Sequence, residues 1–276
     1  MPTAAIDYAA EYNNRARVPE HPVIMAGWAR DAAAYRDERP DASLGIAYGP
    51  SPRMRYDWFP AAGDAPVVLF IHGGYWQALD GGSFSHMARG ANAHGVAMAV
   101  ATYDLCPQVT IAAITEAMRQ LVEHLVRQRG GPVTVFGHSA GGHLAAELLA
   151  TDWRGRSAAA PPVTAAMPVS GLFELEPLVA TPINAALGLD PAEARACSPL
   201  GRPVPAGTRL IAMVGGDESG EYLRQSRELV ETWGAGGARA RLIVAPGANH
   251  FTVLAPFASP DSSATRDLVS LAQGGF

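Results

Sequence analysis

The sequence predicts an α/β fold in which helices flank a mostly parallel central sheet, and three observations support it. Short continuous apolar runs are typical of strands buried on both faces. Segments with apolar residues at helical spacing lie between these runs, and glycine or proline marks several of the junctions. Strands that alternate with helices pair in parallel through right-handed crossovers, so we expect one such sheet.

Length and composition favour a single domain over residues 1–276. Of the 276 residues, 48% are hydrophobic and 17% are charged, so the chain can fill a sizeable core. Residues 1–60 are predicted to form an N-terminal arm that is helical at its start. Edge strands are expected around residues 44–48 and 53–59.

The first buried elements follow the arm. Apolar runs predict strands at residues 67–71 and 96–100. An amphipathic helix is predicted next, because apolar residues recur at helical spacing at Ile111, Ile114, Met118, Leu121, Val122 and Leu125. Glycine and proline at residues 130–132 end this helix before a strand at 133–136, which leads into a helix with Leu144, Leu148 and Leu149 on one face.

The second half of the chain continues the alternation. Residues 163–169 predict a strand, which Pro168 weakens at its end. Residues 171–208 are rich in proline and alanine, and we expect a small helical, cap-like insertion over the site. Further strands are predicted at 210–214 and 242–245, with helices at 221–233 and 262–272.

Residues 137–142, Gly-His-Ser-Ala-Gly-Gly, carry the strongest chemical signal. They follow a predicted strand and open a predicted helix, which is the setting of the G-x-S-x-G nucleophile elbow in an α/β-hydrolase fold. Gly137 and Gly141 leave room for the sharp turn, and the hydroxyl of Ser139 then projects above the end of the sheet. The motif therefore predicts a serine hydrolase with Ser139 as its nucleophile.

A serine nucleophile needs a base and an acid, which follow it along the chain in this fold. His143 is misplaced for the base because it lies on the helix that follows the serine, whereas His250 lies in a loop after the last predicted strand. The acid should follow the strand at 210–214, where Asp217 and Glu218 compete. The common spacing of three residues after Gly215 favours Glu218, and a turn one residue shorter would favour Asp217.

The loop at residues 72–76, His-Gly-Gly-Tyr-Trp, predicts the oxyanion hole. Its glycines allow the backbone N–H groups of Gly73 and Gly74 to face the reacting carbonyl together with the amide of Ala140. The histidine at position 72 is expected to order the loop. The candidates for substrate binding are Tyr75, Trp76 and His138; the two aromatic residues could instead belong to the core.

Other classes of function are disfavoured. The net charge of −5 and the lack of a basic stretch argue against a nucleic-acid partner. No apolar run is long enough for a membrane span and no signal peptide is visible, so we expect a cytoplasmic protein with no membrane partner. Two cysteines, Cys106 and Cys197, do not form a disulfide framework.

Cofactor chemistry is also disfavoured. All 21 basic residues are arginine, which excludes mechanisms that need a lysine amine, such as Schiff-base and pyridoxal-phosphate chemistry. No zinc motif of the H-E-x-x-H type occurs. We therefore expect no metal and no cofactor. The expected partner is a small-molecule substrate, and a homodimer is retained as a candidate assembly.

Together these stretches resemble the kynurenine formamidase (arylformamidase) branch of the α/β-hydrolases, which is related to hormone-sensitive-lipase-type esterases. The similarity lies in the segments at residues 11–15, 72–76, 103–107, 137–143 and 221–226. It implies a triad of Ser139, an acid and His250, with the oxyanion hole at Gly73 and Gly74. Eukaryotic members carry aspartate at the acid position, where alignment on the helix at 221 places Glu218.

Three hypotheses for the function follow. The resemblance implies cleavage of N-formyl-L-kynurenine to L-kynurenine and formate, through a formyl-enzyme on Ser139. A carboxylesterase acting on small aryl or alkyl esters would use the same residues. A catalytically inactive hydrolase fold used as a binding module is disfavoured, because such proteins usually lose the serine, the histidine or the oxyanion glycines, all of which are present.

Overall fold

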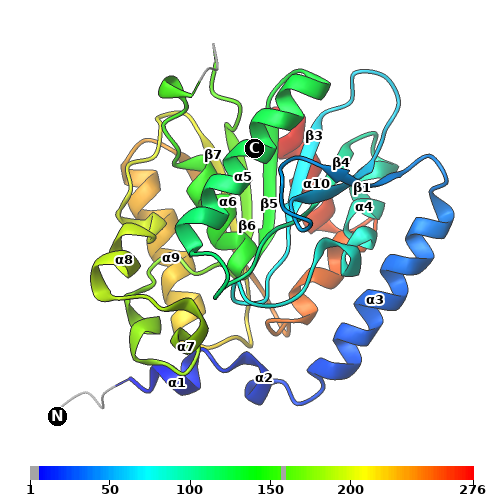
Figure 1. The fold of residues 1–276 in the computed structure, drawn as a ribbon. Helices are drawn as coiled ribbons and strands as arrows, with labels where there is room; N and C mark the ends of the chain where they lie inside the picture. The colour runs from blue at the N-terminus through cyan, green and yellow to red at the C-terminus, as the bar shows by residue number, and fades with distance from the viewer. Residues whose placement is uncertain (1–5, 157–159) are drawn as a thin grey trace.

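The computed structural model describes residues 6–156 and 160–276, and an eight-stranded sheet lies at its centre (Figure 1). The strand order is β1-β2-β4-β3-β5-β6-β7-β8. β2 pairs antiparallel with both β1 and β4, and all other neighbours pair in parallel. The bounds, from β1 to β8, are Ser43–Ala47, Arg55–Phe59, Val67–Ile71, Ala97–Thr102, Val133–His138, Ala165–Val169, Arg209–Gly215 and Arg239–Ala245. The predicted fold class is confirmed.

All predicted strands are found, with small shifts at their ends. Pro168 does not end β6, which continues to Val169 and pairs with β5 opposite Gly137. β8 begins earlier than the apolar run suggests because it is an edge strand and half exposed, so Arg239 and Arg241 can belong to it. Both guanidinium groups lie over the ring of Phe276, which gives these charged residues an apolar neighbour.

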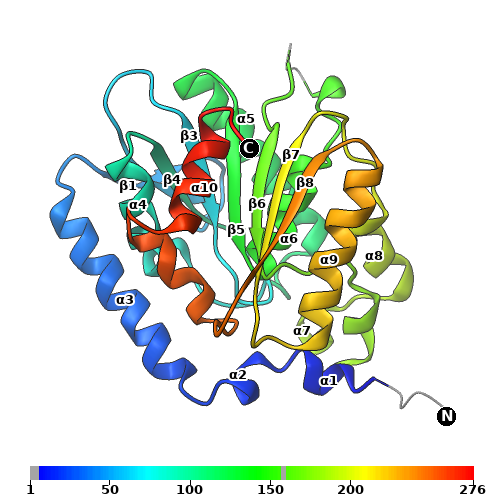
Figure 2. The same ribbon diagram turned by 180° about the vertical axis from the view of Figure 1, so that it is seen from behind.

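The alternation of side chains along the buried strands divides the core into two layers. In β3, Val67, Leu69 and Ile71 face one cluster, whereas Val68 and Phe70 face the other. Helices α5 (Ile111–Arg129), α6 (Ala140–Leu149) and α9 (Gly220–Ala235) pack in the first cluster. Helices α3 (His21–Glu38), α4 (Ala88–Ala93) and α10 (Ser263–Ala272) pack in the second. Figure 1 shows α5 and α6 in front of the sheet, and Figure 2 shows α10 in front of the opposite face.

Several short helices lie outside the predicted elements. Residues 81–93 form two 3-10 turns and α4, where the apolar pattern of the sequence predicts no element. The segment 171–208 contains α7 (Asn184–Leu187), α8 (Pro191–Ala196) and 3-10 turns. Across the described ranges, every helix is too short or too polar to cross a lipid bilayer.

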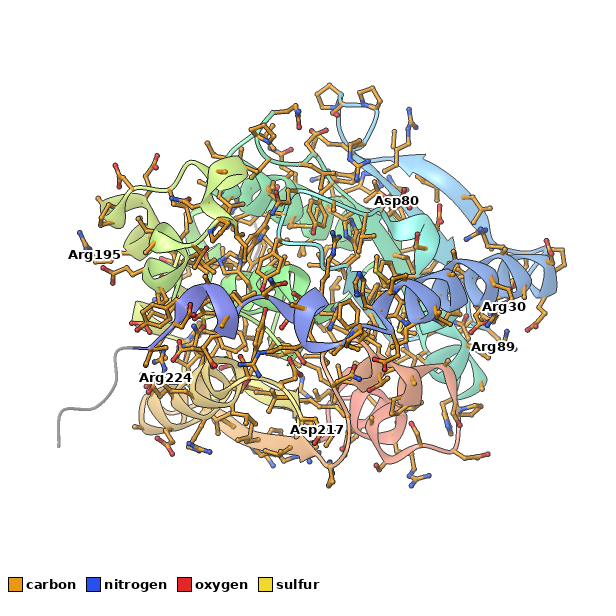
Figure 3. The ribbon with its side chains drawn as sticks, turned by 90° about the horizontal axis from the view of Figure 1, so that it is seen from below. Arg30, Asp80, Arg89, Arg195, Asp217 and Arg224 are labelled. Carbon is orange, nitrogen blue, oxygen red and sulfur yellow. The ribbon has the colours of Figure 1, made fainter. Side chains whose placement is uncertain are left out.

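The N-terminal arm crosses one end of the molecule. It comprises α1 (Tyr8–Glu11), α2 (Asn14–Arg17) and the long helix α3, which runs along one side (Figures 1 and 3). Residues 1–5, which the prediction of a helical arm includes, lie outside the described residues. Ser139 follows β5 at the same end of the sheet, so the arm lies near the residues that the sequence singled out.

Candidate active site

Ser139 occupies the turn between β5 and α6 and has a strained backbone. Its φ of +56° and ψ of −119° fall in a region that residues with side chains seldom adopt. A Cβ atom at Gly137 would lie 2.1 Å from the carbonyl oxygen of Gly141, and one at Gly141 would lie 1.9 Å from the carbonyl oxygen of Ile71. Only glycine fits either position, so the sequence of this turn is dictated by its geometry.

The loop after β3 passes directly against the serine. A Cβ atom on Gly73 would lie 2.9 Å from the Cβ of Ser139, and Gly74 has a φ of +105° that favours glycine. Within the described residues, the backbone N–H groups of Gly73, Gly74 and Ala140 donate no hydrogen bond. Ala140 also begins α6, whose N-terminal end is electropositive. Unpaired donors beside a nucleophile can stabilise a developing oxyanion.

His250 and Glu218 are joined by a hydrogen bond. Nδ1 of His250 donates to Oε2 of Glu218 at 2.6 Å, and the other carboxylate oxygen accepts from the Ser170 hydroxyl at 2.5 Å and the Gly215 N–H at 2.8 Å. The Glu218 side chain is fully buried. This bond fixes the tautomer of His250 and leaves Nε2 as the acceptor.

His250 and Ser139 line the same cavity. In the part of the chain that the structure describes, the Ser139 hydroxyl makes no hydrogen bond to Nε2 of His250. Such bonds are often long in a free enzyme and tighten when the substrate binds.

Asp217 does not contact His250. Its side chain is exposed and lies at the edge of the molecule in the view of Figure 3, whereas Glu218 is buried. The turn after β7 explains the difference, because the N–H of Asp217 donates to the carbonyl of Ala248 and that of Glu218 donates to the carbonyl of Gly215. Adjacent side chains therefore point in different directions.

His138 supports the loop that carries His250. Its Nε2 donates to the backbone carbonyl of His250 at 2.8 Å, and its ring lies 4.8 Å from the His250 ring. Burial, reinforced by the nearby His250, holds the pKa of His138 well below its usual range. The imidazole is therefore neutral at physiological pH and serves as a donor, while one edge also lines the cavity.

The side chains of the two aromatic residues of the loop lie in different places. Tyr75 and Trp76 both adopt positive φ, which turns the chain sharply. Tyr75 lines the cavity, as predicted for a wall residue. Trp76 does not line it: the side chain is fully buried and packs edge-on against His143, with ring centroids 5.0 Å apart. The expectation that Trp76 contacts substrate is corrected, because the turn directs the indole into the core.

His72 orders the loop, as its position suggests. Its Nδ1 donates to the carbonyl of Gly73 at 2.7 Å, and its ring stacks on Tyr103 at 4.2 Å. The hydroxyl of Tyr103 donates to the carbonyl of His72 at 2.8 Å. Burial lowers the pKa of His72 to about 4, so the ring is neutral and the loop is held by uncharged contacts.

The cavity above Ser139 has a volume of about 470 Å³. Its wall combines the elbow, the loop after β3, the loop of His250, the N-terminal arm and part of the insertion, at Thr181, Pro182 and Ile183. A space of this size accommodates a small organic substrate.

Residues 68–254 match the family model described as the alpha/beta hydrolase fold. The chain belongs to this family. The matched range contains Ser139, Glu218 and His250, and it covers the strands from β3 to β8. The protein is accordingly a hydrolase.

Individual relatives show a more specific similarity than the family model does. Kynurenine formamidase from Salmo salar is 28% identical over 240 residues, which cover 83% of this chain and 81% of that protein. Kynurenine formamidase from Drosophila melanogaster is 27% identical over 74% of this chain and 72% of that protein. The resemblance of this hydrolase to kynurenine formamidases is thus confirmed.

Two solved structures share its fold. One is described as a putative thioesterase from Silicibacter sp., with a TM-score of 0.86 and 34% identity over 95% of this chain and 98% of that one. An esterase of the bacterial hormone-sensitive lipase family has a TM-score of 0.66 and 22% identity over 93% and 97% of the two chains. The second comparison supports the fold alone.

Sequence reasoning missed several residues of the hydrolase site that come from the arm and α9. The ring of Tyr222 lies 4.7 Å from that of His250, and its hydroxyl is hydrogen-bonded to Asn14 and Tyr75. Burial raises the pKa of Tyr222 above its usual value, so the phenol stays protonated. The signal was present in the resemblance, because the stretches at 11–15 and 221–226 contain the residues that meet here.

Proposed function

We propose that this hydrolase cleaves an aryl formamide, N-formyl-L-kynurenine, to L-kynurenine and formate through a formyl-enzyme on Ser139. The observation that carries the proposal is the similarity to kynurenine formamidases over most of both chains. The hydrogen-bonded Glu218 and His250 at the cavity of Ser139 support it, since they supply the acid and base that a serine nucleophile requires.

In the proposed first step, Nε2 of His250 takes the proton of Ser139 as Oγ attacks the formyl carbon. The carbonyl oxygen becomes an oxyanion, which the N–H groups of Gly73, Gly74 and Ala140 stabilise. Glu218 remains ionised and stabilises the imidazolium of His250. These residues are held in place before the substrate arrives, because the elbow, the glycine loop and the buried carboxylate are each fixed by the fold.

The second step releases the aromatic amine. An amide anion is a poor leaving group, so the proton on His250 passes to the anilide nitrogen as the carbon–nitrogen bond breaks. Water then loses a proton to His250 and attacks the formyl ester. The tetrahedral adduct collapses, formate leaves, and Ser139 regains its proton.

A carboxylesterase is the second candidate. The solved relative with 34% identity is described as a putative thioesterase, and cleavage of an acyl–oxygen or acyl–sulfur bond needs the same nucleophile and oxyanion donors. The two candidates differ in the acyl group, because a formyl group needs less space beside Ser139 than a longer acyl chain. A cytoplasmic location is part of the proposal, in keeping with the free thiols of Cys106 and Cys197.

The test is kcat/KM for N-formyl-L-kynurenine beside p-nitrophenyl esters of increasing acyl length. We expect the formamide to be preferred and ester turnover to fall as the acyl chain grows. Strong ester turnover with no formamide cleavage would replace the first candidate by the second. Ser139→Ala is the matched control: it should abolish both turnover and labelling by a fluorophosphonate, and labelling of this variant would contradict the role of Ser139.

A further inference from the structure

One residue that lines the cavity of Ser139 carries a permanent charge, Arg15 of the N-terminal arm. Among the described residues that line it, no aspartate, glutamate or other arginine is present, and the two histidines are His138 and His250. The remaining wall is apolar or carries neutral polar groups. A substrate in this cavity therefore meets a residue with a positive charge and no acidic residue in the lining.

Arg15 is also unpaired. Across residues 6–156 and 160–276, its guanidinium forms no ion pair and no hydrogen bond; the residue is exposed and lines the cavity. Neighbouring arginines at this end of the molecule are neutralised. Arg17 pairs with Glu11 at 2.7 Å, and Arg224, labelled in Figure 3, contacts three carboxylates, those of Glu174, Glu221 and Glu228.

The backbone that carries Arg15 is fixed by buried contacts. Nδ2 of the preceding residue, Asn14, donates to the hydroxyl of Tyr222 at 2.9 Å and to that of Tyr75 at 3.3 Å. The Tyr75 hydroxyl donates to the carbonyl of Tyr12 at 2.6 Å. These bonds tie the arm to α9 and to the loop that borders Ser139, so the arm holds Arg15 at the cavity.

A second set of contacts secures the start of the arm on α9. The hydroxyl of Tyr12 donates to Glu221 at 2.8 Å and accepts from Nε2 of Gln225 at 2.7 Å. The carboxylate of Glu11 accepts from the backbone N–H of Glu221 at 3.0 Å, at the electropositive first turn of the helix. Buried hydrogen bonds thus hold the arm in place, and the arm carries the exposed, unpaired Arg15.

We propose that Arg15 binds a carboxylate of the substrate, remote from the scissile bond. Guanidinium and carboxylate form two parallel charge-assisted hydrogen bonds, which fix orientation as well as affinity. This inference rests on the proposed function, in which the amino-acid carboxylate of N-formyl-L-kynurenine is the group bound. It adds that the hydrolase selects aryl amides or esters that bear a carboxylate over neutral ones of the same shape.

The experiment compares substrates that differ only in this charge. One pair is N-formyl-L-kynurenine and its carboxamide; the other is 3-(4-acetoxyphenyl)propionate and its carboxamide. The variants are Arg15→Gln and, as a control for loss of one positive charge, Arg227→Gln, an exposed arginine on α9 away from the cavity. Because the ester pair does not require formamidase activity, it tests Arg15 even where the formamide pair is not cleaved.

We expect Arg15→Gln to lower kcat/KM about tenfold for the carboxylate members, as for loss of a hydrogen bond to a charged group. The loss should appear in KM with kcat unchanged, and the carboxamides should be unaffected. Arg15→Lys should restore part of the preference, and Arg15→Glu should reverse it. Equal losses for both members of each pair, or the same result with Arg227→Gln, would overturn the proposal.

The unmodified protein provides a second measurement. Raising the ionic strength from about 0.01 M to about 1 M shortens the Debye length from about 30 Å to about 3 Å. The preference for the carboxylate members should fall accordingly, while turnover of the carboxamides stays constant. A preference that does not change with salt would contradict an ion pair at Arg15.

Discussion

Replacing Glu218 by glutamine tests the centre of the proposed mechanism. One carboxylate oxygen of Glu218 accepts from Ser170 and Gly215, and the other accepts from Nδ1 of His250. In Glu218→Gln, the single carbonyl oxygen of the amide satisfies the first two donors. The amide nitrogen then faces Nδ1, which must become an acceptor, so the proton moves to Nε2.

An imidazole with its proton on Nε2 cannot accept the proton of Ser139. We expect kcat to fall by about 10⁴, as for the equivalent change in a Ser-His-Asp triad. At about 1.36 kcal/mol per tenfold change, this is about 5.4 kcal/mol of lost transition-state stabilisation. The fold should survive, because the change keeps the size of the side chain and all three of its hydrogen-bonded partners, with only the direction of the bond to His250 reversed.

The assay is steady-state hydrolysis of p-nitrophenyl acetate and N-formyl-L-kynurenine, with thermal unfolding as a check on the fold. Asp217→Asn is the matched control: this neighbouring carboxylate is exposed, so its loss should leave kcat unchanged. A kcat for Glu218→Gln within tenfold of the unmodified protein, or a larger loss for Asp217→Asn, would refute the reasoning.

Three further predictions concern stability. Tyr222→Phe removes a buried hydroxyl that accepts from Asn14, so the free energy of unfolding in urea should fall by about 1–3 kcal/mol; an unchanged midpoint would show that the amide finds another partner. Gly141→Ala places a Cβ 1.9 Å from a backbone carbonyl and should cost about 3 kcal/mol in the same assay, whereas Gly201→Ala, which meets nothing within 4 Å, should be neutral. Burial lowers the pKa of His72 and of His143 to about 4 each, below the value of about 6.5 in the unfolded chain. The unfolded chain therefore takes up protons first, and stability should decrease from pH 6.5 toward pH 4 by about 1.4 kcal/mol per pH unit for each histidine; equal stability at pH 7 and pH 5 would contradict this.

The strands and the elbow could be predicted from the sequence because their signals are local. A strand buried on both faces, such as Val67–Ile71, must be apolar at every position, and the crowding at Gly141 excludes any side chain. The edge strand β8 was predicted less completely, since its first residues are half exposed and carry charges. Spacing along the chain favoured Glu218 over Asp217 as the partner of His250. The direction in which each side chain points could be seen only in the structure.

The contributions of the arm could not be derived from local patterns. Asn14 and Tyr222 are 208 residues apart, and nothing in periodicity or spacing links them. The position of the Trp76 side chain also could not be derived from local sequence patterns. Trp76 follows the glycine loop beside Ser139, yet two successive positive φ angles turn its ring into the core. Such backbone reversals depend on the packing around them more than on the sequence of the loop.

The contacts between the arm and α9 determine which parts of the structure can form first during synthesis of the chain. Hydrogen bonds between residues 208 to 213 positions apart form only after α9 has been made, and closing so long a loop is slow. A nascent chain that has completed the turn of Ser139 still lacks α9, and with it the anchor that holds the arm over the cavity. The wall of the cavity above Ser139 is therefore completed only after α9 has left the ribosome and the arm has docked on it.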